Sequence, residues 1–206
     1  MRTILLLSQI DEVQNWLVAF LKDKGARNIA YIIDAKKPRL LVEKDYIFKD
    51  KLVFEAAGLG VKMVDLESVA GTDLETVFED IDAIYVKGGN CFYLLNAMRK
   101  SGFDKIVNKL LNKGAIYVGE SAGAYVACPT IEMAHWKHQD RDIVGLSDLT
   151  GLGIVPFLVS AHYTDELKSV LAPYIKACKY DVKLLKDNEV IISDGVSARL
   201  IHNNLL

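Results

Sequence analysis

Short apolar runs alternate with segments of helical periodicity along most of the chain, and this alternation limits the possible folds more than any other feature. The apolar runs are too short for helices and predict strands at residues 4–7, 29–33, 61–65, 83–86 and 115–118. The segments between them predict helices at residues 11–24, 43–57, 91–99 and 103–112. The pattern predicts an α/β fold in which helices wrap a central sheet.

The pattern changes after residue 130, because residues 131–151 are polar and show no clear period. Beyond them we expect a strand at 157–161, a helix at 165–178 and a strand at 182–185. The last two apolar runs, at 190–193 and 198–202, flank Asp194-Gly195 and predict a C-terminal β-hairpin. No repeat or linker interrupts the 206 residues, so we expect a single domain over residues 1–206.

Composition excludes several classes of partner. The net charge of −2 is too small to predict binding to nucleic acid or to an anionic membrane. No apolar stretch approaches the roughly 18 residues that span a bilayer, and no secretory signal pattern follows Met1, so we expect a cytoplasmic protein. Cys91, Cys128 and Cys178 are widely spaced and predict reduced thiols. The carboxylates show no ligand spacing, so we expect neither a metal nor a cofactor.

The segment Gly119-Glu120-Ser121-Ala122-Gly123 matches the pattern G-x-S-x-G. An apolar run precedes it and small helix-forming residues follow it, which is the strand–turn–helix setting that a nucleophilic serine requires. The serine of such a turn has a sparsely populated backbone conformation, and the flanking glycines remove side chains that would collide there. We predict Ser121 as a nucleophile, with a simple helix cap as the alternative.

A nucleophilic serine needs a base, and the base needs an acid to orient it. His162 follows the strand expected at 157–161, at the end where sheets present functional side chains, and is the favoured base. Asp187 follows the strand expected at 182–185 and is the favoured acid. The sequence leaves other candidates open: His135, His138, His202, Asp140, Asp165 and Asp194.

An oxyanion hole needs two backbone N–H groups that face the carbonyl under attack. Ala122, directly after the nucleophile, supplies one of them. Gly88 and Gly89 follow a predicted strand and let bare backbone approach a substrate, so we predict the second donor there, with an ordinary turn as the alternative. Asn90 and Glu120 are predicted substrate contacts, Glu120 through a free amino group unless it is a solvated turn residue.

The order of these motifs resembles the peptidase E (aspartyl dipeptidase) family. The resemblance is carried by Gly88-Gly89-Asn90, then by residues 119–124, then by His162 at the end of a strand. It extends from the fourth predicted strand to the hairpin. It implies a flavodoxin-like, three-layer αβα architecture with a mostly parallel central sheet, shared with class I glutamine amidotransferases and related to cyanophycinase.

The resemblance also implies an activity, that of a serine-type peptidase or amidohydrolase acting on small peptides. In that family's arrangement Ser121 is the nucleophile, His162 the base and Asp187 stands where the family has its acid, which is a glutamate there. The family carries an arginine after the histidine that grips a substrate aspartate, whereas residues 163–179 contain none. Only Arg141 is positioned to replace it, so we expect Asp-X dipeptides to be poor substrates.

Three other functions remain possible from the residues. An esterase of the α/β-hydrolase class orders its triad serine, acid, histidine, which would require His202 near the C-terminus. A glutamine amidotransferase needs a thiolate where this chain has Ser121. A binding module that kept the fold and lost turnover is the alternative of a different class.

Overall fold

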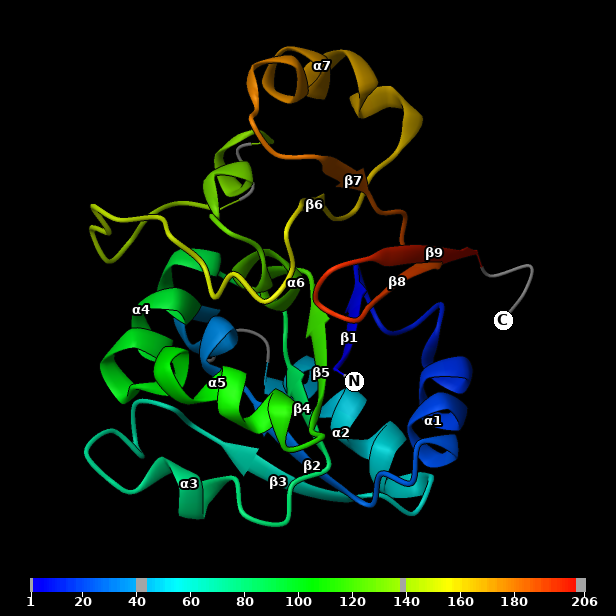
Figure 1. Ribbon diagram of the computed structural model, residues 1–206, viewed down its shortest axis with the longest axis vertical. Helices are drawn as coiled ribbons and strands as arrows, with labels where there is room; N and C mark the ends of the chain where they lie inside the picture. Colours follow the sequence, from blue (N-terminus) through cyan, green and yellow to red (C-terminus); the bar gives the residue numbers. More distant parts are fainter. Residues whose placement is uncertain (1, 40–43, 138–139, 203–206) are drawn as a thin grey trace.

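The computed structural model describes residues 2–39, 44–137 and 140–202 (Figure 1). A seven-stranded sheet runs through its centre in the order β3-β2-β4-β5-β1-β8-β9. The first five strands of that order are parallel, and β8 and β9 add an antiparallel hairpin at one edge. The strands are β1 (Thr3–Leu7), β2 (Asn28–Ile32), β3 (Gly60–Val64), β4 (Ala83–Val86), β5 (Ile116–Glu120), β8 (Glu189–Ser193) and β9 (Ala198–His202). The mostly parallel sheet and the C-terminal hairpin are confirmed.

Helices cover both faces of this sheet and make three layers. One face packs against α1 and α2, and the other against α3, α4, α5 and α6 (Figure 1). The helices are α1 (Gln14–Asp23), α2 (Lys44–Ala56), α3 (Leu74–Val77), α4 (Cys91–Ser101), α5 (Phe103–Asn112), α6 (Ala122–Ala127) and α7 (Lys168–Ala177), with short 3-10 helices η1 (Asp34–Arg39), η2 (Glu132–His135) and η3 (Asp165–Leu167). None of the helices in the described ranges combines the length and apolar character needed to cross a bilayer.

Residues 4–7 of strand β1 are all apolar because both faces of the strand are covered. Leu5 and Leu7 belong to the core beneath α1, whereas Ile4 and Leu6 belong to the core on the opposite face. All four side chains are fully buried. Side chains alternate between the faces of a strand, so a central strand covered on both faces needs apolar residues at every position.

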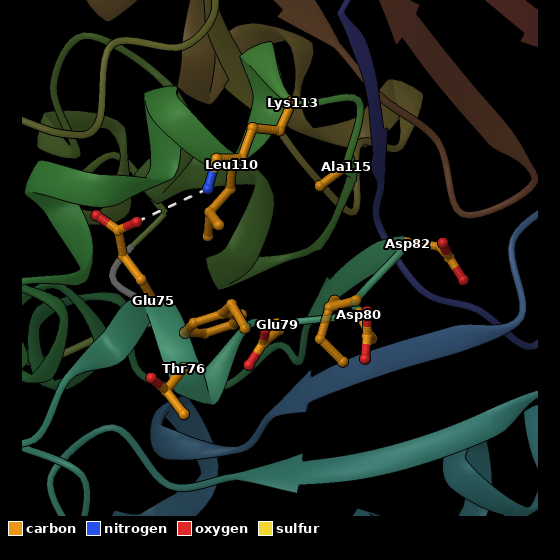
Figure 2. Close-up of a pocket in the computed structure, with 10 residues that line it drawn as sticks. Glu75, Thr76, Glu79, Asp80, Asp82, Leu110, Lys113 and Ala115 are labelled. Atoms are coloured by element: carbon orange, nitrogen blue, oxygen red, sulfur yellow. Dashed lines mark ion pairs between the residues drawn. The ribbon is translucent and has the colours of Figure 1, made fainter.

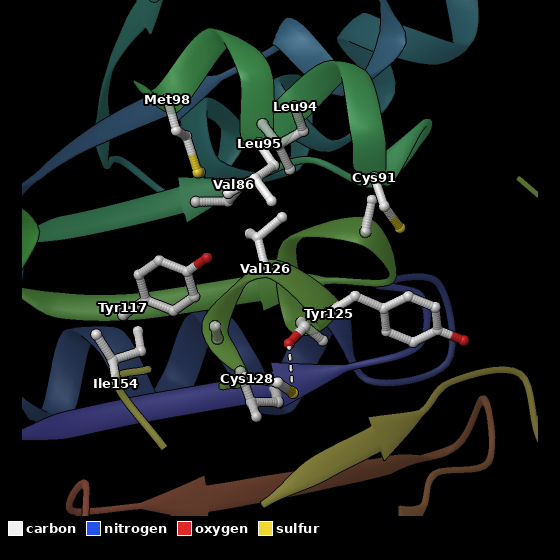
Figure 3. Close-up of a cluster of buried hydrophobic side chains, with 14 of the residues drawn as sticks. Val86, Cys91, Leu94, Leu95, Met98, Tyr117, Tyr125, Val126, Cys128 and Ile154 are labelled. Carbon is white, nitrogen blue, oxygen red and sulfur yellow. Dashed lines mark hydrogen bonds between the residues drawn. The ribbon is translucent and has the colours of Figure 1, made fainter. Parts of the chain in front are cut away.

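Helix α6 is buried along its entire length between the sheet and α4 (Figure 3). Val126 of α6 lies near Val86 of β4 and Leu95 of α4. Below it, the hydroxyl of Tyr117 on β5 donates to the Gly123 carbonyl oxygen at 2.8 Å. A helix enclosed in this way has little freedom to move, and it therefore fixes the turn that precedes it.

The strands expected at 157–161 and 182–185 pair with each other and not with the central sheet. They are β6 (Leu158–Ser160) and β7 (Val182–Leu184), which form a separate two-stranded parallel sheet, connected through α7 and drawn above the central sheet in Figure 1. Strand β1 pairs with β5 on one side and with β8 on the other, so neither of its edges is available to β6. Buried Val159 and Leu185 join this small sheet to the core that contains α6.

Candidate active site

Ser121 occupies a tight turn between β5 and α6, as the motif predicts. Its backbone has φ 49° and ψ −105°, a conformation that residues with a side chain rarely adopt. Its N–H donates to the Leu7 carbonyl oxygen at 2.8 Å, so the end of β1 holds the turn. Ser121 is partly exposed and lies at the carboxyl end of the parallel strand β5.

The two glycines of the motif are required by close packing. A Cβ atom on Gly119 would lie 2.5 Å from the Gly123 carbonyl oxygen. A Cβ atom on Gly123 would overlap the carbonyl oxygen of Val86 in β4. Both glycines therefore let β5, the turn and α6 approach one another more closely than any other residue allows.

His162 lies two residues after the end of strand β6, next to Ala161. Its φ is 54°, again unusual for a residue with a side chain. Its N–H donates to Ser8 Oγ at 2.9 Å, and Ser8 Oγ donates to the Leu185 carbonyl oxygen at 2.9 Å. Ser8 is buried and the sequence analysis missed it, although it follows the end of β1 just as His162 follows β6. A strand-end position was the available signal.

The side chains of Ser121, His162 and Asp187 meet although they come from three separate segments. His162 Nε2 lies 3.1 Å from Ser121 Oγ. His162 Nδ1 lies 2.7 Å from Asp187 Oδ1. The side chains of His162 and Asp187 are 34% and 43% exposed, so the group opens to solvent. Both distances lie within hydrogen-bonding range for a nucleophile, a base and an orienting acid.

The other candidate acids have different contacts. Asp140 accepts a hydrogen bond from the Cys91 N–H at 2.9 Å, at the start of α4. Asp165 is exposed and lies 3.6 Å from the ammonium of Lys186. Asp194 accepts backbone N–H groups in the hairpin turn, which lowers its pKa. None of these carboxylates contacts His162 within the described residues.

The other histidines are also engaged elsewhere or not described. His135 is exposed and its ring packs 4.9 Å, centroid to centroid, from Phe92. His202 Nδ1 lies 2.7 Å from Glu189 Oε1 on the hairpin. His138 lies outside the described residues.

The structure differs from the sequence prediction at Gly88 and Glu120. The Gly88 N–H donates to Glu120 Oε2 at 3.0 Å, so it is not available to an oxyanion. Glu120 is only 3% exposed and also meets the ammonium of Lys87, and its carboxylate is therefore neither solvated nor open to a substrate. The physical reason is strand alternation, because Glu120 shares a face with Val118 and that face is covered by α1 and α2.

Gly89 and Ala122 supply the backbone N–H groups that stay open. Among the described residues, neither N–H has a hydrogen-bond partner. Gly89 has φ 151°, and a Cβ atom there would overlap the Ala35 carbonyl oxygen. A glycine is thus required at this position by both its conformation and its packing.

Asn90 is a helix cap, which differs from its predicted role as a substrate contact. Its Oδ1 accepts from the Tyr93 N–H at 2.9 Å at the start of α4. Its Nδ2 donates to the Arg141 carbonyl oxygen at 2.9 Å. Both ends of the side-chain amide are therefore engaged within the protein.

Lys137 lies next to the histidine segment and was also missed by sequence analysis. Its ammonium donates to the Ala161 carbonyl oxygen, one residue before His162. Burial lowers the pKa of Lys137 to about 8, and the nearby carboxylate of Asp187 opposes this shift. Lys137 therefore loses its charge at a lower pH than an ordinary lysine does.

One group of carboxylates in the described ranges has a spacing that would suit a metal: Asp34, Asp65 and Glu67. The ammonium of Lys37 lies among them, bonded to Asp65 and, at 2.9 Å, to Glu67 Oε2. Burial lowers the pKa of Lys37, but the two carboxylates outweigh it and raise the pKa overall. The lysine supplies the positive charge that this group needs.

A pocket of about 370 Å³ lies at the amino ends of β4 and β5 (Figure 2). Its lining includes Asp82 and Ala115, which precede β4 and β5, and also Glu75 and Lys113, which form an ion pair of 3.7 Å. Because Ser121 follows the carboxyl end of β5, this pocket is remote from the serine–histidine–aspartate group.

The chain is similar to several known peptidases. Peptidase E of Citrobacter koseri is 36% identical over 123 residues, which cover 60% of this chain and 50% of that protein. An uncharacterized peptidase of Listeria monocytogenes serovar 1/2a is 27% identical over 165 residues, covering 80% of each chain. A crystal structure from Listeria monocytogenes EGD-e, proposed to be a peptidase E, matches with a TM-score of 0.83 and 25% identity over 98% of both chains.

A match to a family model supports the same relationship. The model for peptidase family S51 matches residues 4–201, nearly the whole chain. The predicted resemblance to peptidase E and the predicted serine hydrolase class are confirmed by this match and by the named relatives. The protein belongs to peptidase family S51 and is a serine peptidase.

Proposed function

We propose that the protein hydrolyses small peptides through Ser121 as nucleophile, His162 as general base and Asp187 as the acid that orients the base. The observation that carries this proposal is the position of the His162 ring. Its two nitrogens lie 3.1 Å from Ser121 Oγ and 2.7 Å from Asp187 Oδ1. A ring held between a hydroxyl and a carboxylate in this way matches the roles of a catalytic triad.

In the first half of the reaction, Ser121 Oγ attacks the carbonyl carbon of the scissile peptide bond. His162 Nε2 accepts the proton from Oγ as the new carbon–oxygen bond forms. Asp187 accepts the hydrogen bond from Nδ1–H, which keeps Nε2 unprotonated before the attack and stabilises the imidazolium afterwards. The strained backbone of Ser121 directs Oγ away from the turn towards the substrate.

The carbonyl oxygen gains negative charge during the attack and requires hydrogen-bond donors. We assign this role to the N–H groups of Gly89 and Ala122, which follow β4 and the nucleophile in the chain and have no acceptor among the described residues. Gly88 is excluded from the assignment because its N–H is bonded to Glu120.

The second half returns the enzyme to its starting state. The imidazolium of His162 donates its proton to the leaving amine as the carbon–nitrogen bond breaks, which leaves an acyl group on Ser121. A water molecule then attacks the acyl carbon, His162 accepts its proton, and Ser121 Oγ leaves as an alcohol with that proton.

Substrate preference is the finer part of the proposal. An enzyme that selects aspartate needs a fixed cation in the pocket, because burying an unpaired carboxylate is costly. The Arg141 side chain is exposed, although its backbone meets Asn90. We therefore expect Asp-X dipeptides to be cleaved no faster than Ala-X or Leu-X. A panel of X-Leu dipeptides compared by kcat/KM tests this, and a preference for Asp of about 100-fold, or about 2.7 kcal/mol, would contradict it.

The nucleophile is tested by labelling the protein with a fluorophosphonate probe. In that reaction an oxygen–phosphorus bond forms at Ser121, the phosphorus–fluorine bond breaks, fluoride leaves, and His162 takes the hydroxyl proton. We expect the wild type to be labelled at Ser121 by mass spectrometry, and Ser121→Ala to be folded and unlabelled. A wild type that is not labelled, or a labelled Ser121→Ala, would overturn the proposal.

A further inference from the structure

Three charged side chains are buried together beneath the turn that carries Ser121. Lys87, Asp50 and Glu120 are each at most 3% exposed. The Lys87 ammonium lies 3.0 and 3.2 Å from the two oxygens of Glu120, and it is also bonded to Asp50 Oδ2. The Tyr85 hydroxyl donates to Asp50 Oδ2 at 2.9 Å. Burying a charge is costly, so each of these groups depends on the partners that the cluster provides.

The register of β4 and β5 brings Lys87 and Glu120 together. Val86 of β4 is paired with Gly119 of β5, and Lys87 and Glu120 are the next residues along the two parallel strands. Both side chains therefore turn towards the α2 face, where Asp50 meets them from α2. Burial raises the pKa of Asp50, and the neighbouring Glu120 raises it further.

Glu120 connects the buried cluster to the glycine turn. Its Oε2 accepts from the Gly88 N–H at 3.0 Å. Gly88 itself is packed against the nucleophile, since a Cβ atom there would lie 2.9 Å from Ser121 Cβ. Two residues later, the Asn90 N–H donates to the Ala35 carbonyl oxygen at 2.8 Å. The backbone is thus fixed on both sides of Gly89, and only the Gly89 N–H between the two bonds is left open among the described residues.

We propose that Glu120, held by Lys87 and Asp50, is a positioning residue that aims the Gly89 N–H at the oxyanion by bonding the Gly88 N–H. The inference rests on the proposed function, because it requires Ser121 to be the nucleophile. Lys87 neutralises a carboxylate that would otherwise be buried without a partner. Asp50 holds the ammonium from its other side.

Two substitutions separate the hydrogen bond from the charge. Glu120→Gln removes the charge but keeps an oxygen that accepts from Gly88, and Glu120→Leu removes both. Each leaves the Lys87–Asp50 pair balanced. The rate constant of fluorophosphonate labelling and the kcat and KM for a cleaved peptide are measured for both variants, together with thermal unfolding.

We expect Glu120→Gln to label within about fivefold of the wild type. Loss of one oxyanion donor costs about 10²–10³ in kcat, so Glu120→Leu should lose labelling rate and kcat by about 100-fold with KM changed by less than about threefold. A role in stability alone would lower the melting temperature without this division between kcat and KM. A folded Glu120→Leu that labels at the wild-type rate, or a Glu120→Gln as slow as Glu120→Leu, overturns the inference.

A matched control lies at the other end of β4. The Asp82 carboxylate accepts from the N–H groups of Arg27 and Asn28, at 2.8 and 2.9 Å, at the opposite edge of the sheet. Asp82→Leu should lose stability and keep the wild-type labelling rate. If Asp82→Leu labels as slowly as Glu120→Leu, the effect is not specific to the turn and the inference is overturned.

A measurement on the wild type covers the case in which Glu120→Leu does not fold. In ¹⁵N-labelled protein, phosphonylation of Ser121 should shift the amide proton of Gly89 downfield and leave that of Gly88 in place. A shift at Gly88 with none at Gly89 overturns the inference. A wild type that is not phosphonylated at all shows instead that the proposed function has failed, and the inference fails with it.

Discussion

Replacing Ser8 by alanine tests how His162, the proposed general base, is held. Ser8 Oγ accepts from the His162 N–H and donates to the Leu185 carbonyl oxygen, both at 2.9 Å. It therefore ties the ends of β1, β6 and β7 together. Removing the hydroxyl should reduce both stability and activity, because His162 has a backbone φ of 54° that its surroundings must maintain.

The size of the effect follows from which groups lose their partners. The Leu185 carbonyl oxygen still accepts from the Tyr163 N–H at 3.0 Å, so only the His162 N–H is left without an acceptor. A buried unsatisfied donor costs about 1–3 kcal/mol, and His162 is only partly buried, so we expect about 1.5 kcal/mol. For a chain of this size that corresponds to a fall of about 3–6 °C in melting temperature. A small displacement of the ring should reduce the labelling rate by about 10- to 100-fold.

Ser101 offers a matched control for this substitution. Its buried hydroxyl also accepts from a backbone N–H, that of Phe103, and donates to a carbonyl, that of Met98. Ser101→Ala should therefore lower the melting temperature by a similar amount and leave fluorophosphonate labelling unchanged. If Ser8→Ala labels as fast as Ser101→Ala, the anchoring role of Ser8 is refuted.

Three further predictions address other parts of the site. Gly89→Ala should lower the free energy of unfolding, measured in urea, by about 2–6 kcal/mol and abolish nearly all labelling, because its Cβ would overlap Ala35 and its φ is 151°. Gly25 has a φ of 79° but open space around it, so Gly25→Ala should lower the free energy of unfolding by only about 1–2 kcal/mol and keep labelling. Because burial lowers the pKa of Lys137 to about 8 from 10.5, the unfolded chain binds a proton between these pH values that the folded chain has released. Wild-type stability should therefore rise with pH across that window relative to Lys137→Met, and equal slopes would contradict the shift. Asp187→Asn should reduce kcat by about 10⁴, as in a serine protease triad, and a loss below tenfold would reassign the acid.

Local patterns in the sequence were sufficient for the central sheet and for the turn at Ser121. Apolar runs of the correct length mark buried strands, and the motif at residues 119–123 fixes its own strand–turn–helix context. His162 and Asp187 were selected for their positions after strands, and the structure brings them to Ser121. Position after a strand was thus an adequate guide even without knowledge of strand pairing.

The missed features depend on long-range contacts or on strand alternation. Nothing in residues 157–161 or 182–185 indicates that they pair with each other. The edge of β1 is occupied by β8, which lies far along the chain, and local sequence patterns do not reveal that long-range pairing. Glu120 is different, since its parity with Val118 places it on a buried face and was available in the sequence. The prediction for Glu120 considered only its place in the G-x-S-x-G motif. The direction of its side chain is instead decided by its position in strand β5.

The candidate site is divided between two sheets, and we expect this division to make activity sensitive to partial unfolding. The hydroxyl comes from the end of the central sheet, whereas the imidazole and the carboxylate follow the strands of the small sheet β6-β7. If the small sheet separated from the core, Ser121 would lose its contact with His162 although the seven-stranded sheet stayed intact. We therefore expect mild denaturant to inactivate the enzyme before the central sheet melts, with deuterium uptake in β6 and β7 increasing in parallel with the loss of activity.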